Sequence, residues 1–197
     1  MPCAWPIDHG LLQEARDRGH EIGVHGYDHS NRTPFCAKNR RIERLEAAKH
    51  LIERYQITGY RAPSLFRTPA LLRGLPRYYR YDSSVPSSGG LFPVPSTGCA
   101  SARPFFIGNL LELPISLPRD GSLKFLGHSP QEILKFWIDG SEEIASSGGV
   151  VVLLTHCEER FSGNSPMLAV YREFLEYISR SKKFYWSSSA EVLSQVS

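Results

Sequence analysis

The chain has 197 residues, of which 41% are hydrophobic and 22% charged. This composition is typical of a globular protein and excludes a disordered or low-complexity one. The formal net charge of +3 is too small to predict binding to nucleic acid. We therefore expect a single compact domain over residues 1–197.

The sequence has no run of about 18 apolar residues and no signal-peptide pattern at its start. It therefore predicts no contact with a membrane and, as written, a cytoplasmic protein. Cys3, Cys36, Cys99 and Cys157 form no C-x-x-C pair, so we expect four free thiols rather than a zinc knuckle or a redox motif.

Helical and strand patterns alternate along the chain, as the spacing of apolar residues indicates. Thr33 is the predicted N-cap of the longest helix, with Pro34 at its first position. The predicted elements are helix 7–18, strand 20–24, helix 34–56, strand 59–63, helix 68–72, strand 77–82, strand 110–115, helix 130–147, strand 150–154, helix 166–181, strand 184–187 and helix 190–195.

The most hydrophobic run is Val150-Val151-Val152-Leu153-Leu154, which is continuous rather than alternating. Such a run predicts burial on both faces, as in a parallel sheet or barrel. The alternation of strands and helices therefore favours a parallel α/β barrel or a doubly wound sheet. Residues 83–104 are rich in Ser, Gly and Pro without periodicity, and predict a functional or mobile surface loop.

His25 and His29 stand four residues apart in the turn after strand 20–24. A neutral imidazole is a common ligand of zinc and similar cations, and two on one loop favour a metal site. This spacing also arises by chance, and the pair alone fits surface or core histidines equally well.

Polar residues end most of the predicted strands, and in a parallel sheet such ends share one edge. Metal-bound histidines, a proton-donating histidine, an arginine and an aspartate there would suit hydrolysis. Other readings remain open: Asp82 as an Asx turn, Arg61 as a surface residue and Glu112 as the partner of a neighbour. His156 needs partners or a role because it directly follows apolar strand 150–154. The strand-end residues are His25, His29, Arg61, Asp82, Glu112 and His156.

Five segments in order resemble the polysaccharide deacetylase family, also called the NodB-homology or carbohydrate esterase family 4 domain. The first resembles the family's H-x-x-x-H metal motif, the second its Arg-x-Pro motif and the last its Thr-His motif. The segments are Gly-His-Glu-Ile-Gly-Val-His-Gly-Tyr-Asp-His (19–29), Tyr-Arg-Ala-Pro (60–63), Tyr-Asp-Ser-Ser (81–84), Glu-Leu-Pro-Ile-Ser (112–116) and Leu-Leu-Thr-His (153–156).

The resemblance implies a distorted (β/α) barrel of the NodB type and metal-dependent removal of N- or O-acetyl groups from an amino sugar or polysaccharide. It implies that His25 and His29 bind a divalent metal, most often Zn²⁺. It further implies that Arg61 orients a catalytic carboxylate, that His156 is the general acid, and that Asp82 supports the site. The expected partner is an acetylated saccharide.

One feature of the family is missing from the sequence. Family members carry an Asp-Asp pair on their first strand, one aspartate acting as base and the other as metal ligand. Neither Asp8 nor Asp28, the candidates near the histidines, stands in such a pair here. We therefore expect a barrel incomplete at its N-terminus and weaker metal binding. Its open sheet edge could pair with a second copy.

Three interpretations follow: a deacetylase lacking its first strands, a non-catalytic saccharide-binding or scaffold protein, and an altered amide hydrolase that uses Asp28 or Asp8 as a substitute ligand.

Overall fold

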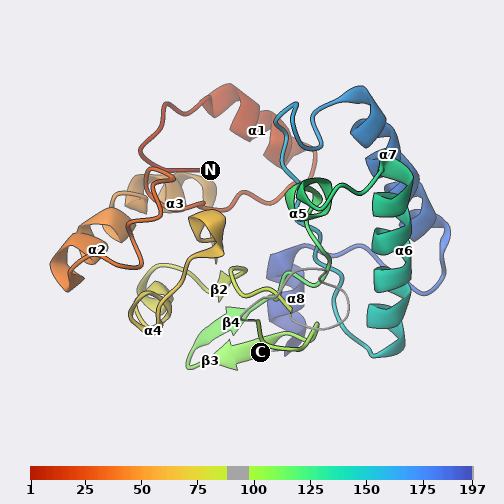
Figure 1. Cartoon of the computed structure of the whole chain (residues 1–197). Helices are drawn as coiled ribbons and strands as arrows, with labels where there is room; N and C mark the ends of the chain where they lie inside the picture. The colour runs from red at the N-terminus through yellow and green to blue at the C-terminus, as the bar shows by residue number, and fades with distance from the viewer. Residues whose placement is uncertain (88–97, 197) are drawn as a thin grey trace. The chain divides into compact units, whose positions relative to one another are not determined.

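The computed structural model of the protein describes residues 1–87 and 98–196 and shows short strands and eight labelled helices (Figure 1). The α-helices are α1 His9–Asp17, α2 Lys38–Glu46, α3 Lys49–Tyr55, α4 Pro69–Leu72, α5 Asp120–Phe125, α6 Pro130–Ser146, α7 Ser165–Arg180 and α8 Ser189–Val196. The 3₁₀ helices are η1 Pro63–Leu65 and η2 Leu75–Arg77. The strands are β1 Gly59–Tyr60, β2 Tyr81–Asp82, β3 Phe105–Ile107 and β4 Leu110–Glu112.

The chain divides into two compact units, which we describe separately. The first unit comprises Met1–Val85, Phe105–Leu113 and Ser187–Ser197. The second unit comprises Pro86–Pro104 and Pro114–Trp186. All four cysteines are free thiols, as predicted.

The sheet lies in the first unit and has the order β1-β2-β4-β3. β1, β2 and β4 are parallel, whereas β3 runs antiparallel to β4. The result is an α/β fold with a mixed, open sheet among the described residues, so the α/β class is confirmed and the predicted distorted barrel is not. Pairing of two copies through a sheet edge stays a prediction.

Gly59 allows β1 and β2 to approach closely. A Cβ atom at this position would lie 2.0 Å from Cζ of the buried Tyr81 ring, so no larger residue fits without movement. Beside β1, the predicted strand 20–24 is reduced to a single parallel bridge between Val24 and Tyr60. Predicted strand 77–82 begins instead with η2, and only its last two residues form β2.

Helix α8 completes the first unit from the far end of the chain. Val192 and Leu193 pack against a buried cluster of Tyr81, Leu111 and Leu113 on the sheet. The backbone N–H of Ala190 donates to Glu21 Oε2 at 3.2 Å, and Tyr81 Oη donates to Glu21 Oε1 at 2.8 Å. The prediction of a closing helix at 190–195 is therefore confirmed.

The predicted helix 34–56 is two helices, α2 and α3, separated at 47–48. Thr33 is not an N-cap, because α2 begins only at Lys38, with Ala37 at the N-cap position. The Thr33 hydroxyl instead accepts a hydrogen bond from Arg44 Nε at 2.9 Å. The backbone N–H groups of Phe35 and Cys36 both donate to the Arg32 carbonyl, so residues 32–36 form a turn before α2 begins.

Helices α6 and α7 pack against each other in the second unit (Figure 1). Trp137 and Phe174 meet edge to face there, with ring centroids 5.6 Å apart. Ser129 and Glu132 form a capping box at the start of α6, so the predicted cap is confirmed. The prediction of helix 166–181 is also confirmed, within one residue at each end.

The predicted strands 150–154 and 184–187 are wrong. Residues 150–154 are only half-buried and form no regular strand, although Ser116 N donates to the Val152 carbonyl at 3.1 Å. The Ser116 hydroxyl accepts the Val152 N–H at 2.7 Å, so a side chain takes the place of a strand partner. Tyr185 and Trp186 are 76% and 62% exposed and lie in irregular structure.

The prediction of a surface loop at 83–104 is wrong at its start, because residues 83–87 are buried. Pro86 forms a parallel bridge with Ile115, within the second unit. Residues 88–97 lie outside the described residues. No described helix combines the length and the apolar character that crossing a bilayer requires.

Candidate functional site

The carboxyl ends of neighbouring strands in the first unit carry the predicted polar residues. The register places Val24 beside Tyr60, Tyr60 beside Asp82 and Asp82 beside Glu112. His25 and Arg61 follow the first two of these positions directly. The structure therefore brings His25, Arg61, Asp82 and Glu112 to one edge of the sheet, as parallel pairing predicts.

His25 is held in the form that binds a metal. Its Nδ1 lies 2.9 Å from the Arg61 backbone oxygen, and because a carbonyl only accepts, Nδ1 carries the proton. The Nε2 atom then keeps its lone pair. Burial lowers the pKa of His25 to about 4, so the imidazole is neutral at pH 7.

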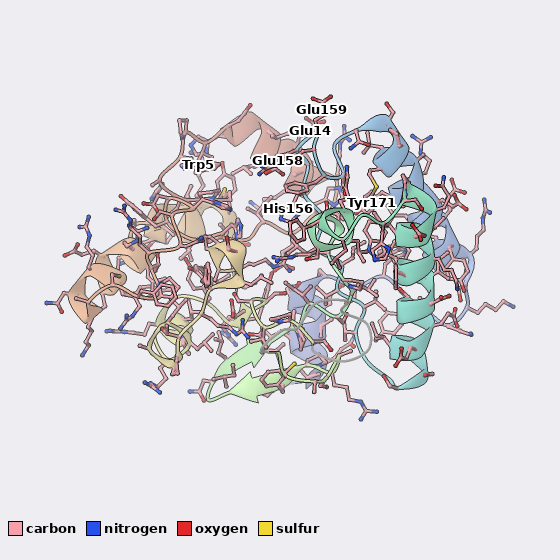
Figure 2. All side chains as sticks on the ribbon, in the orientation of Figure 1. Trp5, Glu14, His156, Glu158, Glu159 and Tyr171 are labelled. Carbon is pink, nitrogen blue, oxygen red and sulfur yellow. The ribbon has the colours of Figure 1, made fainter. Side chains whose placement is uncertain are left out.

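His29 lies next to His25 in a turn with left-handed backbone. Its φ is 62°, and the two imidazole centroids are 4.9 Å apart. Trp5, on the stretch before α1 (Figure 2), lies beside His29 with the ring planes tilted by 40° and the centroids 5.9 Å apart. The turn is tied down by Asp28, whose Oδ1 accepts from Ser30 Oγ at 2.5 Å and pairs with Arg44.

A third protein ligand does not accompany the two histidines. Within residues 1–87 and 98–196, no group of three or more His, Cys, Asp or Glu side chains is placed to hold a metal ion. Asp8 caps α1 by accepting from Leu11 N at 3.0 Å, and Asp28 pairs with Arg44. The imidazoles fit a divalent cation in donor type, but a catalytic zinc commonly has three protein ligands.

Arg61 is half-buried and reaches toward the segment after β2. Its Nε donates to the Ser83 carbonyl at 2.9 Å and its Nη2 to the Ser83 hydroxyl at 2.8 Å. The guanidinium is therefore fixed by the backbone that follows Asp82. Arg61 is therefore not simply a surface residue, which was the alternative that the sequence left open.

Asp82 and Glu112 are fully buried at the ends of β2 and β4. Asp82 Oδ1 accepts from the Ser84 hydroxyl at 2.7 Å, whereas the Ser84 backbone N–H donates to Glu112, so the Asx turn left open by the sequence is not formed. Glu112 Oε1 accepts from the backbone N–H of Ser84 at 3.1 Å and of Val85 at 2.8 Å. Both carboxyls thus act inside the protein rather than at its surface.

His156 lies in the second unit, on the segment before α7 (Figure 2), and its partner is Asp120. Its Nδ1 donates to Asp120 Oδ1 at 2.7 Å, and its backbone N–H donates to Oδ2 at 2.8 Å. Ser162 Oγ also donates to Oδ2 at 2.6 Å. The Asp120 side chain is 0% exposed and the His156 side chain 33% exposed, so the histidine is oriented and accessible.

Sequence reasoning missed Asp120. Burial raises the pKa of Asp120, but the hydrogen bonds from His156 and Ser162 outweigh it and hold the pKa below its ordinary value. Asp120 is therefore the carboxylate that fixes the His156 tautomer, whereas Asp82 contacts Ser84 and Glu112. The signal available was an acidic residue opening a short helix just after a predicted strand.

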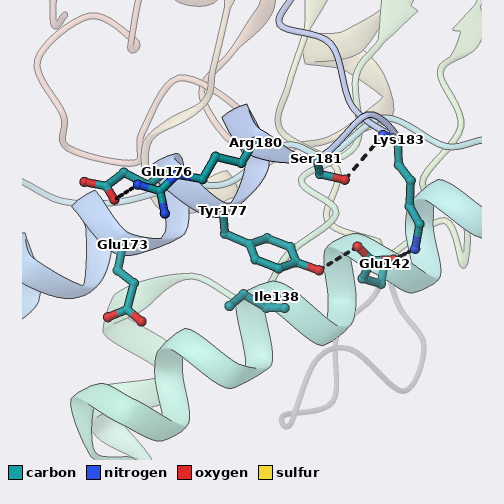
Figure 3. Close-up of a pocket in the computed structure, with 8 residues that line it drawn as sticks. All are labelled: Ile138, Glu142, Glu173, Glu176, Tyr177, Arg180, Ser181 and Lys183. Atoms are coloured by element: carbon teal, nitrogen blue, oxygen red, sulfur yellow. Dashed lines mark hydrogen bonds and ion pairs between the residues drawn. The ribbon is translucent and has the colours of Figure 1, made fainter.

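A shallow hollow of about 460 Å³ lies between α6 and α7 (Figure 3). Tyr177 Oη donates to Glu142 at 2.7 Å, Lys183 pairs with the same carboxylate, and Arg180 pairs with Glu176. Both cations of the hollow are thus paired with carboxylates of its own lining, and we assign it no function. It is lined by Ile138, Glu142, Glu173, Glu176, Tyr177, Arg180, Ser181 and Lys183.

Comparison with known proteins connects the chain to one family. A family model described as polysaccharide deacetylase matches residues 5–77. No curated protein matches the chain.

Solved structures resemble the chain over nearly its whole length. A structure assigned as a polysaccharide deacetylase from Mycobacterium smegmatis is 19% identical with a TM-score of 0.69, covering 95% of this chain and 66% of that one. One from Pseudomonas aeruginosa PAO1, assigned likewise, is 18% identical with a TM-score of 0.71, covering 94% and 62%. Puue allantoinase is 17% identical with a TM-score of 0.67, covering 94% and 61%.

At these identities the structural likeness establishes the fold alone. The chain spans between 61% and 66% of the length of the three structures. The sequence match and the fold agree on the resemblance seen in the motifs. Residues 5–77 therefore match the polysaccharide deacetylase family model, within a chain that shares its fold with structures named for that family.

Proposed function

We propose that this protein is a metal-dependent hydrolase that removes N- or O-acetyl groups from an amino sugar or polysaccharide. The observation that carries the proposal is the pair of adjacent imidazoles, His25 and His29, of which His25 is neutral and has its Nδ1–H bonded to the Arg61 carbonyl. That arrangement leaves a lone pair on Nε2, the atom a cation would use.

The proposed roles follow from the contacts of each side chain. His25 and His29 would supply two ligands to a divalent metal, with Zn²⁺ as the first candidate. Such a metal, when bound, polarises a carbonyl and acidifies its water. Asp120 holds the Nδ1 proton of His156, so that Nε2 is the atom at which His156 exchanges a proton. Arg61 is fixed by Ser83 and presents a positive charge at the strand ends.

Two observations favour other functions. The described residues give the histidine pair no third ligand, which suits a saccharide-binding or scaffold protein that has the fold without the chemistry. The likeness to a structure named as an allantoinase suits an amide hydrolase. A substitute-ligand role for Asp8 or Asp28 has less support, because both carboxylates are engaged elsewhere.

Zinc binding and acetate release separate these functions. We expect the wild-type chain to bind zinc in titration calorimetry and to release acetate from N-acetylglucosamine oligomers. His25→Ala and His29→Ala should each lose zinc binding, whereas His156→Ala should keep zinc and lose acetate release. His20→Ala changes an exposed histidine five residues before His25 and is the matched control.

The outcomes differ for each function. Oligomer binding without acetate release would identify a binding protein. Hydrolysis of a small cyclic amide without acetate release would favour the amide hydrolase. Zinc binding and acetate release that both survive His25→Ala would refute the site.

A further inference from the structure

Asp82 and Glu112 form a buried pair of carboxyls for which the proposed reaction has no direct use. They are register partners on the parallel strands β2 and β4. Both residues are 0% exposed, so neither can touch a substrate. Each carboxyl affects the pKa of the other, as two adjacent acidic groups do.

Each carboxyl has one oxygen that accepts hydrogen bonds and one that has no partner in the described part of the chain. Asp82 Oδ1 accepts from Ser84, and Glu112 Oε1 accepts from two backbone N–H groups. Asp82 Oδ2 and Glu112 Oε2 are buried, and neither receives a hydrogen bond from another group among the described residues. A buried polar atom without a partner is costly, so these two oxygens need a proton between them.

Two adjacent carboxylates in a buried site cannot both be charged without a large cost. One proton removes the repulsion and satisfies both oxygens, because the protonated acid donates to the ionised one. Burial raises the pKa of Asp82, while the hydrogen bond from Ser84 and the positive charge of Arg61 favour its ionised form. Burial, together with the charge of Asp82, raises the pKa of Glu112 to about 10.

We propose that Asp82 and Glu112 share a single proton at neutral pH, and that Glu112, bound to the backbone after β2, positions Arg61. Residues 83–85 connect Glu112 to Arg61 by hydrogen bonds. Glu112 Oε1 binds the N–H groups of Ser84 and Val85, and the neighbouring Ser83 accepts both hydrogen bonds from Arg61. Ser84 Oγ also accepts from Ala62 N at 2.8 Å, which closes the link to the residue after Arg61.

The groups facing the pair come from both neighbouring strands. On the β1 side they are the Tyr60 phenol and the Arg61 guanidinium. A charged Asp82 keeps the phenol neutral and attracts the guanidinium. On the β3 side Phe105 is the register partner of Glu112 and does not titrate. Arg61 is therefore the facing cation, and one negative charge on the pair matches it.

Infrared spectroscopy of the full chain at pH 7.5 tests whether the Asp82–Glu112 pair holds a proton. Wild type should show a protonated-carboxyl C=O band that shifts in D₂O. Glu112→Gln should abolish this band, because the amide replaces the acid while still donating to Asp82. Glu53→Gln, an exposed residue on α3, should leave it. A wild-type spectrum without the band, or a band that survives Glu112→Gln, would overturn the shared proton.

The pH dependence of unfolding gives a second test with a defined sign. Because the native state raises the pKa of Glu112, the native chain holds a proton that the unfolded chain releases above its ordinary pKa of 4.5. Stability from this group is complete below that value and falls as pH rises toward 10. Between pH 6 and 9 the wild-type unfolding constant should rise by roughly tenfold per pH unit relative to Glu112→Gln. If the unfolding constants of wild type and Glu112→Gln changed with pH in the same way, the proposal would be contradicted.

The positioning of Arg61 is read from its Nε–H signal in ¹⁵N NMR spectra, assigned by its loss in Arg61→Lys. We expect the signal to be retained in Glu112→Gln and lost or shifted in Glu112→Ala, which removes the acceptor for Ser84 and Val85. If Glu112→Ala unfolds, Glu112→Asp provides the shortened side chain instead. An Arg61 signal unchanged by both shortenings, or lost in Glu112→Gln, would refute positioning. None of these readouts requires activity, so they stand apart from the proposed hydrolysis.

Discussion

His156 binds both oxygens of Asp120, through its ring Nδ1 at 2.7 Å and its backbone N–H at 2.8 Å. One buried carboxylate therefore sets both the main-chain position and the tautomer of the histidine. Nδ1 must carry a proton, because an ionised carboxylate can only accept. The remaining nitrogen, Nε2, is left as the site of proton exchange.

Asp120→Asn should lower the kcat of acetate release by roughly 10²–10⁴-fold with little change in KM. The amide is isosteric, but each Asp120 oxygen accepts from a backbone N–H, so the NH₂ group would face a donor in either orientation. The variant therefore disturbs the contact with His156 without creating a cavity. Steady-state kinetics on acetylated oligomers measure the effect. Asp139→Asn, an exposed residue paired with Lys135, is the control. Equal kcat values for Asp120→Asn and wild type would remove Asp120 from the proposed mechanism.

Asp120 should also make the protein sensitive to acid. Its pKa is below the ordinary value of 3.8 in the native state, so the native chain binds fewer protons than the unfolded chain near that pH. The stability from Asp120 is present above pH 3.8 and is lost as pH falls through the native pKa. Urea unfolding at pH 6, 4 and 3 should show a smaller acid loss for Asp120→Asn than for wild type. A larger loss in the variant would contradict this sign.

Gly59→Ala should destabilise the first unit by about 2 kcal/mol or more, because the new methyl group would overlap the Tyr81 ring. Tyr81 cannot simply move away, since its hydroxyl is bonded to Glu21. Thermal unfolding followed by circular dichroism measures the cost. Gly23→Ala is a matched control from the neighbouring segment, where the new Cβ makes an ordinary contact at 3.6 Å with the Gly59 oxygen. Similar melting of both variants would show that β1 and β2 can separate.

Arg44→Met should loosen the turn that carries His29. Arg44 is buried, pairs with Asp28, binds Thr33 and lies over the Tyr27 ring at 4.5 Å. We expect a loss of about 2 kcal/mol in stability and weaker zinc binding, because Asp28 and Thr33 lose their shared partner. Arg40→Met removes an exposed pair with Glu43 on the same helix and should change neither quantity. An unchanged zinc affinity in Arg44→Met would show that zinc binding does not depend on the order of this turn.

The sequence predicted best where the determining signal is local. Ser129-Pro130 identifies the start of α6 because the cap and the first turn are contiguous in sequence. Strand-end residues such as Arg61 and Glu112 could be grouped in advance because parallel pairing is a general rule. The family resemblance rests on five short motifs in a fixed order, and each of these motifs is contiguous in the sequence.

Failures arose where distant residues decide the outcome. Asp120 has no role that can be read locally, because its partner lies 36 residues later. Residues 150–154 look like a buried strand, yet the Ser116 hydroxyl occupies a position that a backbone partner would need. Thr33 is a good capping residue in isolation, but Arg44 engages its hydroxyl.

Helix α8 has a consequence for synthesis of the chain. Val192 and Leu193 cover Tyr81, Leu111 and Leu113, and Ala190 binds Glu21, so residues near both ends of this sequence meet in one unit. During translation the strands of the sheet, which end at Glu112, are therefore synthesised well before helix α8, which covers them. During that interval the apolar surface under α8 is open to chaperones and to other nascent chains. The first unit reaches its final packing only after residue 193 has emerged.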